Sequence, residues 1–346
     1  MKNLKRYIYG AGLLGGKLSD WLSAAGIKID AFVDPKKVGV SHKGLPVEGW
    51  NVVDENSILY IGVLNNWVSL KNVCNEAKKY GAKEVLTPPE IFFLLGDNGQ
   101  SRSWYWLNSD KNAVLEACNR TSNFYKNRLD CESLRTLQSI IKYRLNGLID
   151  ETCVLPESRQ YLDAGIKDFW KGEIHLLDAG AYTGDTVAAL MEEGLNLKTC
   201  YSFEPDPLNF AKLIETFKIL NISGACFQAA LGESNGNVKF NSSGTSGSSI
   251  NTNIGNDFCL QVTGDSSLNL FVSHIKMDVE GAELGAMRGL STLIKKHSPK
   301  LAISAYHKPF DLIDIAEYID SFGIYKQFAI RTYANQTFET IIYASP

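Results

Sequence analysis

Two glycine-rich turns, each followed at a fixed distance by a carboxylate, are the segments of this sequence best suited to binding a small molecule. The first is Gly10-Ala11-Gly12-Leu13-Leu14-Gly15, and Asp34 follows Gly15 by 19 residues. The second runs from Asp178 to Thr186, and Glu204 follows Gly184 by 20 residues. Glycines let a backbone approach a ligand closely, and the helix that follows presents unpaired amides to it. A carboxylate at the end of the next strand can then accept both hydroxyls of a ribose.

The two turns differ in the ligand they suit. The first fits the G-x-G-x-x-G dinucleotide fingerprint, so Gly10, Gly12, Gly15 and Asp34 form a candidate nucleotide site. The second starts with an acid, Asp178, which would repel a pyrophosphate in a partly dry site. A ligand with an ammonium group and a ribose suits that turn better, and S-adenosyl-L-methionine is such a ligand.

The elements around the first turn predict a parallel sheet. Apolar runs predict strands at 7–9, 29–34, 58–63 and 84–87 and a helix over 70–80. Strands that alternate with helices at this spacing are typical of a doubly wound α/β domain. We assign this N-terminal domain to residues 1–95.

The second turn belongs to a similar unit, which we assign to residues 169–346. Strands are expected at 174–178, 200–204, 225–231, 272–278, 300–305 and 338–344, with helices over 207–220 and 311–322 and a loop at 242–249. The predicted fold class is therefore α/β, with two Rossmann-like doubly wound sheets.

Residues 96–168 are predicted to be a helical connector packed between the two sheets. Helical spacing is found at 104–107 and through 112–148, and Asp130 is placed to cap a helix that starts near Cys131.

Four segments in the second half resemble the FkbM family of class I S-adenosylmethionine-dependent methyltransferases. They are Leu-Asp-Ala-Gly-Ala-Tyr-Thr-Gly-Asp-Thr (177–186), Phe-Glu-Pro-Asp (203–206), Ala-Ala-Leu-Gly (229–232) and Ile-Lys-Met-Asp-Val-Glu-Gly-Ala-Glu (275–283). The resemblance implies a class I methyltransferase fold with S-adenosyl-L-methionine as cofactor. Residues 7–95, with Gly-Leu-Pro-Val at 44–47, resemble the nucleotide-binding N-terminal domains of sugar-modifying enzymes.

The family resemblance also implies the residues of the cofactor site. Glu204 would bind the ribose, Gln228 and Ala229 would lie beside the adenine, and no acid stands at position 228. The full expected set is Asp178, Gly180, Tyr182, Thr183, Gly184, Asp185, Glu204, Pro205, Gln228, Ala229, Asp278 and Glu280.

The activity that the resemblance implies is O-methylation of a hydroxyl on a sugar-containing or other small metabolite. His307 is the expected general base and Asp278 the second candidate, because a base near the hydroxyl accelerates such a transfer. Asp278 and Glu280 could instead cap the helix after Gly281, and His307 could be structural. No metal site is assigned, although Asp278 and Glu280 have the hard oxygen ligands that Mg²⁺ prefers.

Two other function classes stay open from the sequence. The N-terminal fingerprint could serve a nucleotide- or nucleotide-sugar-dependent oxidoreductase or epimerase, although we find no Tyr-x-x-x-Lys pair in the first 150 residues. Both turns could also belong to a non-catalytic binding module.

Composition limits the remaining choices. The chain has 346 residues, a formal net charge of −3, 45% hydrophobic and 21% charged residues, which predicts about two globular domains. There is no Lys/Arg stripe for nucleic acid and no apolar run long enough for a membrane span. The seven cysteines include no CxxC pair, so we expect reduced thiols and a cytoplasmic protein. A homo-oligomer is left open.

Overall fold

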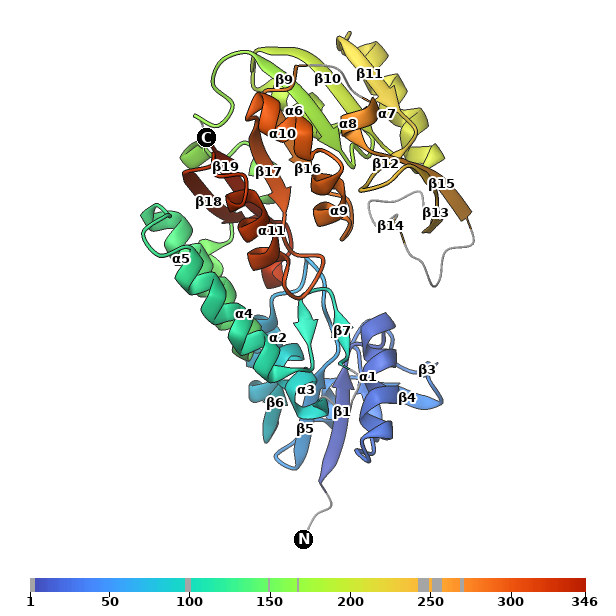
Figure 1. The fold of residues 1–346 in the computed structure, drawn as a ribbon. Coiled ribbons are helices and arrows are strands. Elements are labelled where there is room, and N and C mark those ends of the chain that lie inside the picture. The colour runs from blue at the N-terminus through green and yellow to red at the C-terminus, as the bar shows by residue number, and fades with distance from the viewer. Residues whose placement is uncertain are drawn as a thin grey trace.

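Two α/β halves and a helical segment between them make up the chain in the computed structural model (Figure 1). The structure describes residues 4–96, 101–148, 150–166, 168–241, 249–250, 257–267 and 271–346. Much of the expected loop at 242–249 lies outside these residues.

The N-terminal half is built on a six-stranded sheet with the order β3-β4-β2-β1-β5-β6. Its strands are β1 (Lys5–Tyr9), β2 (Ala31–Val33), β3 (Ser41–His42), β4 (Leu45–Glu48), β5 (Ser57–Ile61) and β6 (Glu84–Leu86). All are parallel except β3, which forms a hairpin with β4. The helices of this half are α1 (Leu13–Ala24), α2 (Leu70–Lys79) and α3 (Pro88–Leu95), with a 3₁₀ turn at Trp50–Val52.

Local sequence explains where these helices start. The side chain of Ser69 accepts a hydrogen bond from the Asn72 amide and caps α2. Thr87 and Glu90 form a capping box at α3, and proline occupies the first helical position, where its missing amide hydrogen costs nothing.

The C-terminal half has a seven-stranded sheet with the order β11-β10-β9-β16-β17-β19-β18. Its strands are β9 (Ile174–Ala179), β10 (Leu197–Phe203), β11 (Gly224–Phe227), β16 (His274–Met277), β17 (Lys300–Ser304), β18 (Gln327–Thr332) and β19 (Thr340–Ser345). Only β19 runs antiparallel to the rest. The strand order reverses between β9 and β16, which is where doubly wound sheets open a binding crevice.

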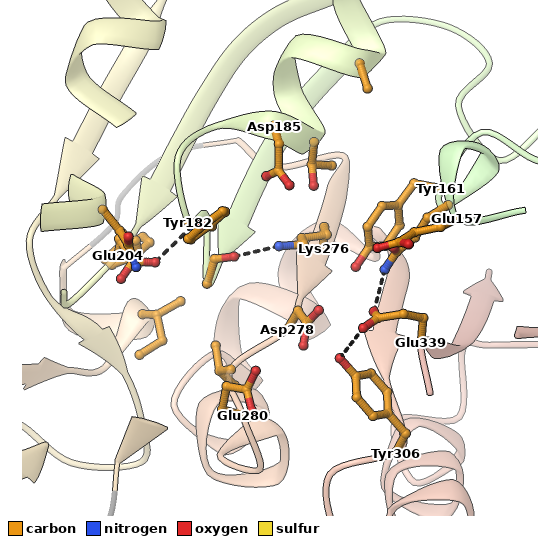
Figure 2. A pocket seen from close by; sticks show the side chains of 18 of the residues that line it. Glu157, Tyr161, Tyr182, Asp185, Glu204, Lys276, Asp278, Glu280, Tyr306 and Glu339 are labelled. Carbon is orange, nitrogen blue, oxygen red and sulfur yellow. Dashed lines mark hydrogen bonds between the residues drawn. The ribbon is translucent and has the colours of Figure 1, made fainter. Parts of the chain in front are cut away.

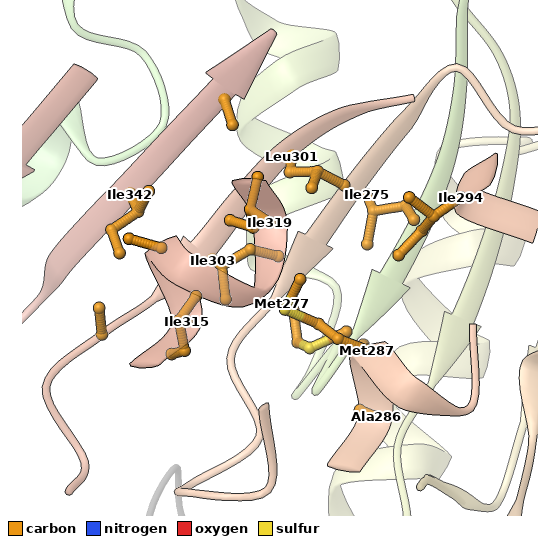
Figure 3. Close-up of a cluster of buried hydrophobic side chains, with 14 of the residues drawn as sticks. Ile275, Met277, Ala286, Met287, Ile294, Leu301, Ile303, Ile315, Ile319 and Ile342 are labelled. Carbon is orange, nitrogen blue, oxygen red and sulfur yellow. The ribbon is translucent and has the colours of Figure 1, made fainter. Parts of the chain in front are cut away.

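Helices cover both faces of this sheet, and apolar side chains between the sheet and the helices form a core on each side. The helices are α6 (Asp185–Glu192), α7 (Pro207–Ile219), α9 (Glu283–Arg288), α10 (Ser291–His297) and α11 (Asp311–Asp320). Figure 3 shows Ile275, Met277 and Ile303 of the central strands against Met287 and Ile315 of the covering helices. Strands buried on both faces need such continuous apolar runs.

Two expected elements of the chain were wrong in detail, and one strand was missed. The strand expected at 225–231 is split, because β11 ends at Phe227 and Ala230–Leu231 (β12) joins another sheet. That four-stranded sheet also contains β13 (Gly236–Asn241), β14 (Ser249–Ile250) and β15 (Asp257–Val262), and α8 (Gly264–Ser267) follows it. Residues 104–107 are not helical but belong to the hairpin of β7 (Ser103–Trp104) and β8 (Leu107–Asn108). β18 was not expected.

The connector contains two helices, α4 (Lys111–Phe124) and α5 (Cys131–Asn146). The Asp130 side chain accepts from the Ser133 amide at the start of α5, which confirms the predicted cap. α5 packs against α3 on one side and against β18 on the other. Short 3₁₀ turns occur at Glu151–Cys153, Glu157–Arg159, Ala164–Ile166 and Asn335–Thr337. Within the described ranges, no helix is both long and apolar enough to cross a membrane.

Candidate active site

A cavity of about 470 Å³ opens at the carboxyl ends of β9, β10 and β16, beside the point where the strand order reverses. This volume is in the range of small-ligand sites. The residues that follow each strand line it: Gly180 after β9, Glu204 after β10 and Asp278 after β16. The N-terminal half adds Asn66, which follows β5.

The second glycine turn is fixed by backbone contact. Gly180 has φ +73°, and a Cβ there would lie 1.8 Å from the Asp278 carbonyl oxygen, so only glycine lets the turn approach β16. Tyr182 is also left-handed, at φ 48°. Gly184, at φ 84°, begins α6 and packs against Leu213 and Thr216.

Glu204, at the end of β10, is hydrogen-bonded to this turn. Its Oε2 accepts a hydrogen bond from the Tyr182 amide at 2.9 Å, and its Oε1 accepts from the Asp206 amide at 2.8 Å. The side chain lines the cavity (Figure 2). Burial raises its pKa to about 7, although the two amides oppose this rise. A ligand hydroxyl that donates to Glu204 would stabilise the ionised form.

Lys276 is the one Lys or Arg among the described lining residues, and its ammonium forms an ion pair with Asp178. Lys276 Nζ lies 3.1 Å from Asp178 Oδ1 and donates to the Gly180 carbonyl at 2.6 Å. Both side chains are buried, but only Lys276 lines the cavity. Burial lowers the Lys276 pKa, and the facing carboxylates, Asp178 first, raise it above its ordinary value. Its ammonium can therefore meet a ligand carboxylate.

A second group of acids lies on the other side of the cavity from Glu204 (Figure 2). It contains Asp278, Glu280 and Glu339. Glu339 Oε1 accepts from the Tyr306 hydroxyl at 2.9 Å, and its Oε2 accepts from Gln160 Nε2 at 2.8 Å. Burial raises the pKa of both Glu280 and Glu339 to about 7. These carboxyl groups can exchange a proton near neutral pH.

His307, the expected general base, does not line the cavity. Its side chain is 3% exposed, and its Nδ1 lies 2.9 Å from Glu283 Oε1. Its Nε2 lies 3.5 Å from Asp278 and 3.6 Å from Glu280. Burial lowers the His307 pKa, but the carboxylates, Glu283 first, raise it well above the usual value. The ring therefore lies behind the cavity acids, and the three carboxylates around it favour its protonated form.

Donor atoms of Asp278, Glu283 and His307 lie within 4.8 Å of one another, a spacing that a metal ion could bridge. This set differs from the Asp278 and Glu280 pair considered from the sequence. In the structure the imidazole already contacts two of these carboxylates, with Nδ1 2.9 Å from Glu283 and Nε2 3.5 Å from Asp278.

Of the expected cofactor residues, seven line the cavity: Gly180, Tyr182, Asp185, Glu204, Pro205, Asp278 and Glu280. Asp178, Thr183, Gly184 and Ala229 do not line it, and Gln228 is exposed. Ala230, Leu231 and Phe240 instead form an apolar part of the wall.

Several lining residues were missed by sequence reasoning, namely Asn66, Glu157, Gln160, Tyr161, Lys276, Tyr306 and Glu339. Lys276 could have been found from the sequence, because a lysine inside an apolar strand is expected to be buried and to need an acidic partner. The others are brought in from distant segments.

The N-terminal glycine turn is held in shape by contacts with its own neighbours. Gly10 has φ +97°, and a Cβ at Gly15 would lie 2.0 Å from the Gly10 carbonyl oxygen. Asp34 Oδ2 accepts from the Ala11 amide at 3.1 Å, and Lys37 Nζ donates to the Ala11 carbonyl at 2.8 Å. The carboxylate expected to bind a ribose therefore holds the turn itself.

Comparison with known proteins identifies the C-terminal half. A family model described as methyltransferase FkbM domain matches residues 178–324. These residues are an FkbM methyltransferase domain. The predicted resemblance of the second half to the FkbM family is thereby confirmed, and this half carries a methyltransferase domain.

Solved structures extend the likeness to the whole chain. The methyltransferase FkbM of Methylobacillus flagellatus KT matches over 99% of this chain and 90% of its own, with 22% identity and a TM-score of 0.78. The N-terminal half thus has a counterpart in that fold, and the α/β class is confirmed. An rRNA methylase from Streptococcus thermophilus matches 51% of this chain and 92% of its own, with 14% identity and a TM-score of 0.33. The comparison with curated proteins gives no match.

Proposed function

We propose that this methyltransferase moves a methyl group from S-adenosyl-L-methionine to a hydroxyl of a sugar-containing or other small metabolite. The observation that carries the proposal is the cavity with Glu204 on one side and a separate set of carboxylates on the other. One side suits a ribose, and the other can take a proton from an acceptor.

The lining residues fit this cofactor. Glu204 would accept the ribose hydroxyls, and Lys276 would meet the carboxylate of the amino acid part. Leu231 and Phe240 offer apolar surface to the adenine, in place of the exposed Gln228. The cofactor, when bound, supplies a methyl group activated by its sulfonium.

The chain itself would orient the acceptor and accept its proton. We assign the general base to Glu280, because its pKa of about 7 suits proton transfer at neutral pH. Its left-handed backbone, at φ 51°, is a strained conformation of the kind held at functional sites. Asp278, the second candidate from the sequence, lies beside it, and His307 holds both acids from behind.

Calorimetry with S-adenosyl-L-homocysteine tests the cofactor site. We expect Glu204→Gln to weaken binding about 10- to 100-fold, because a charge-assisted hydrogen bond to the ribose is lost. Glu215→Gln, on the exposed side of α7, is the matched control and should bind as the wild type does. Equal affinity in all three proteins would reject this placement of the ribose.

The same site allows a pH test. Glu204 is protonated below its pKa of about 7, so it accepts hydroxyl protons poorly there. Affinity for S-adenosyl-L-homocysteine should therefore fall as the pH drops from 8 to 6 in the wild type. If the affinity of Glu204→Gln for S-adenosyl-L-homocysteine falls with pH as it does in the wild type, protonation of Glu204 is not the cause.

We also propose a compartment and a kind of acceptor, from the thiols and the charges of the cavity. All seven cysteines are free in the structure, which supports a reducing compartment such as the cytoplasm. Six acids and one base, Lys276, lie among the described lining residues, which supports a small acceptor rather than a nucleic acid.

A further inference from the structure

Among the residues that the structure describes, the N-terminal half reaches the cavity through the loop that contains Asn66. Residues 62–69 connect β5 to α2, and Asn66 lines the cavity in company with Tyr306 and Glu339. The Asn66 carbonyl accepts from the Asn335 amide at 3.3 Å. The loop is thus docked on the connection between β18 and β19.

Gln336 holds the loop in this place. It is 1% exposed, and its Nε2 donates to the carbonyl of Asn65 at 3.0 Å and to that of Val68 at 2.9 Å. Its Oε1 accepts from the Tyr143 hydroxyl at 3.2 Å. The two bonds from Nε2 therefore hold the loop on both sides of Asn66, and the Tyr143 hydroxyl of α5 holds the amide itself in place.

The two neighbouring asparagines have different roles. Asn65 Oδ1 accepts from the amides of Trp67 and Val68, at 3.1 and 2.9 Å, so this side chain shapes the turn of the loop. The Asn66 side-chain amide has no hydrogen-bond partner among the residues that the structure describes. It is available to a ligand in the cavity.

The connection that carries Gln336 is strained. Gln336, Thr337 and Glu339 are left-handed, with φ of 58°, 63° and 51°. A β-branched residue such as threonine rarely adopts this conformation, and its persistence needs support from the surroundings. The strained turn places Gln336 against the N-terminal loop and Glu339 in the cavity.

We propose that Asn66 contacts the methyl acceptor and that Gln336 is the positioning residue that holds it there. The inference rests on the proposed function, since it assigns the acceptor end of the same cavity. Glu339 and Tyr306 mark this end, away from Glu204 (Figure 2).

The chemistry of this end selects the acceptor. The amides of Asn66 and Gln160 and the carboxylate of Glu339 are hydrogen-bonding partners for hydroxyl groups. Asp278, Glu280 and Glu339 would repel a phosphate or a carboxylate. An anionic acceptor group is therefore disfavoured here, and an uncharged polyhydroxylated group fits these hydrogen-bonding partners.

A cofactor analogue with an extended arm tests the inference without a known acceptor. In this probe a tertiary amine replaces the sulfonium and carries an arm of two to six carbons, ending in a hydroxyl or in a methyl. We expect one arm length at which the hydroxyl improves affinity at least about 5-fold over the methyl. Calorimetry measures this ratio, and S-adenosyl-L-homocysteine serves as the reference ligand.

In Asn66→Ala and in Gln336→Glu, the affinity for the hydroxyl arm should fall to within about 2-fold of the affinity for the methyl arm. The affinity of each variant for S-adenosyl-L-homocysteine should stay unchanged. Gln336→Glu keeps the shape of the side chain but removes the Nε2 donors. Because Gln336 acts through Asn66, the double variant should lose no more than either single variant. Asn72→Ala, at an exposed position of α2, is the matched control and should keep the wild-type ratio.

The outcomes separate the two proposals. A wild-type protein that fails to bind S-adenosyl-L-homocysteine overturns the proposed function. Two outcomes overturn only this inference. In one, S-adenosyl-L-homocysteine binds but no arm length gives the hydroxyl a higher affinity than the methyl. In the other, this higher affinity survives in Asn66→Ala. Asn66→Ala leaves the buried turn intact, so the test holds even where Gln336→Glu fails to fold.

Discussion

Glu280 shows how the environment of one residue sets its chemistry. Its carboxyl group lines the cavity, and its pKa is raised to about 7 mainly by burial, while His307 opposes the rise. A glutamate with an ordinary pKa would be a weaker base at neutral pH. Burial in the cavity wall thus gives Glu280 a pKa near neutral pH, which an exposed glutamate does not have.

The pH profile of methyl transfer should report this carboxyl group. A raised pKa means that the base form appears as the pH rises, so we expect kcat/KM to increase through about pH 7 and then level off. Glu280→Gln should lose about 10²-fold or more in kcat/KM and lack this rise. The measurement is the initial rate of labelled methyl transfer to the small-metabolite fraction of a cell extract.

Two variants serve as references for that profile. Glu233→Gln changes an exposed glutamate and should keep the wild-type profile. If Asp278→Asn removes the rise while Glu280→Gln keeps it, the base is Asp278.

At the scale of elements, Arg331 joins the connector to the edge of the second sheet. It lies on β18, is 1% exposed, and donates from Nε to Asp163 at 3.0 Å and from Nη2 to Glu132 at 2.9 Å. Its Nη1 donates to Ser133 Oγ at 2.6 Å, in the first turn of α5. The guanidinium therefore fixes the start of α5 on β18.

Arg331→Met should lower the free energy of unfolding by about 3 kcal/mol, because the carboxylate of Asp163 and the hydroxyl of Ser133 lose a buried partner. Arg288→Met removes an exposed ion pair with Glu233 and should change stability by less than about 0.5 kcal/mol. Urea unfolding of both variants measures the difference. Equal stabilities would mean that the Arg331 contacts do not hold the connector.

Elements with a regular apolar pattern were predicted well, and those shaped by tertiary contacts were not. The central strands β9, β16 and β17 are buried runs, and helices such as α2 and α11 carry clear amphipathic spacing. β18 was missed because its run contains Arg331, whose burial depends on partners on the connector. The hairpin at 103–108 was read as helix because its aromatic residues face a core from another part of the chain.

At the scale of the whole molecule, the two halves share one core. Trp106, Tyr143, Tyr306 and Phe338 pack in the same apolar cluster as Ile8 and Phe92 of the first half. Phe338 lies on the strained connection, with its ring 4.7 Å from that of Trp106 in an edge-to-face arrangement. Such a core couples the halves, because neither half buries these side chains alone.

Phe338→Ala should lower the free energy of unfolding by about 3–5 kcal/mol, the usual cost of emptying a buried aromatic position. The shared core also predicts a single unfolding transition by calorimetry in the wild type. Phe258→Ala, at a position 69% exposed, is the matched control. Two separate transitions in the wild type would contradict the coupling of the halves.

The sequence by itself determined the α/β class, the FkbM methyltransferase motifs and most residues of the second glycine turn. These features are local, because a strand, a glycine turn and a carboxylate at the next strand end follow each other closely in the chain. Only the tertiary structure decided that His307 lies behind the acids, that Glu280 and Glu339 face the cavity with raised pKa values, and that Asn66 reaches the same cavity. Burial and pairing depend on contacts between distant segments, so the pattern of neighbouring residues does not contain them.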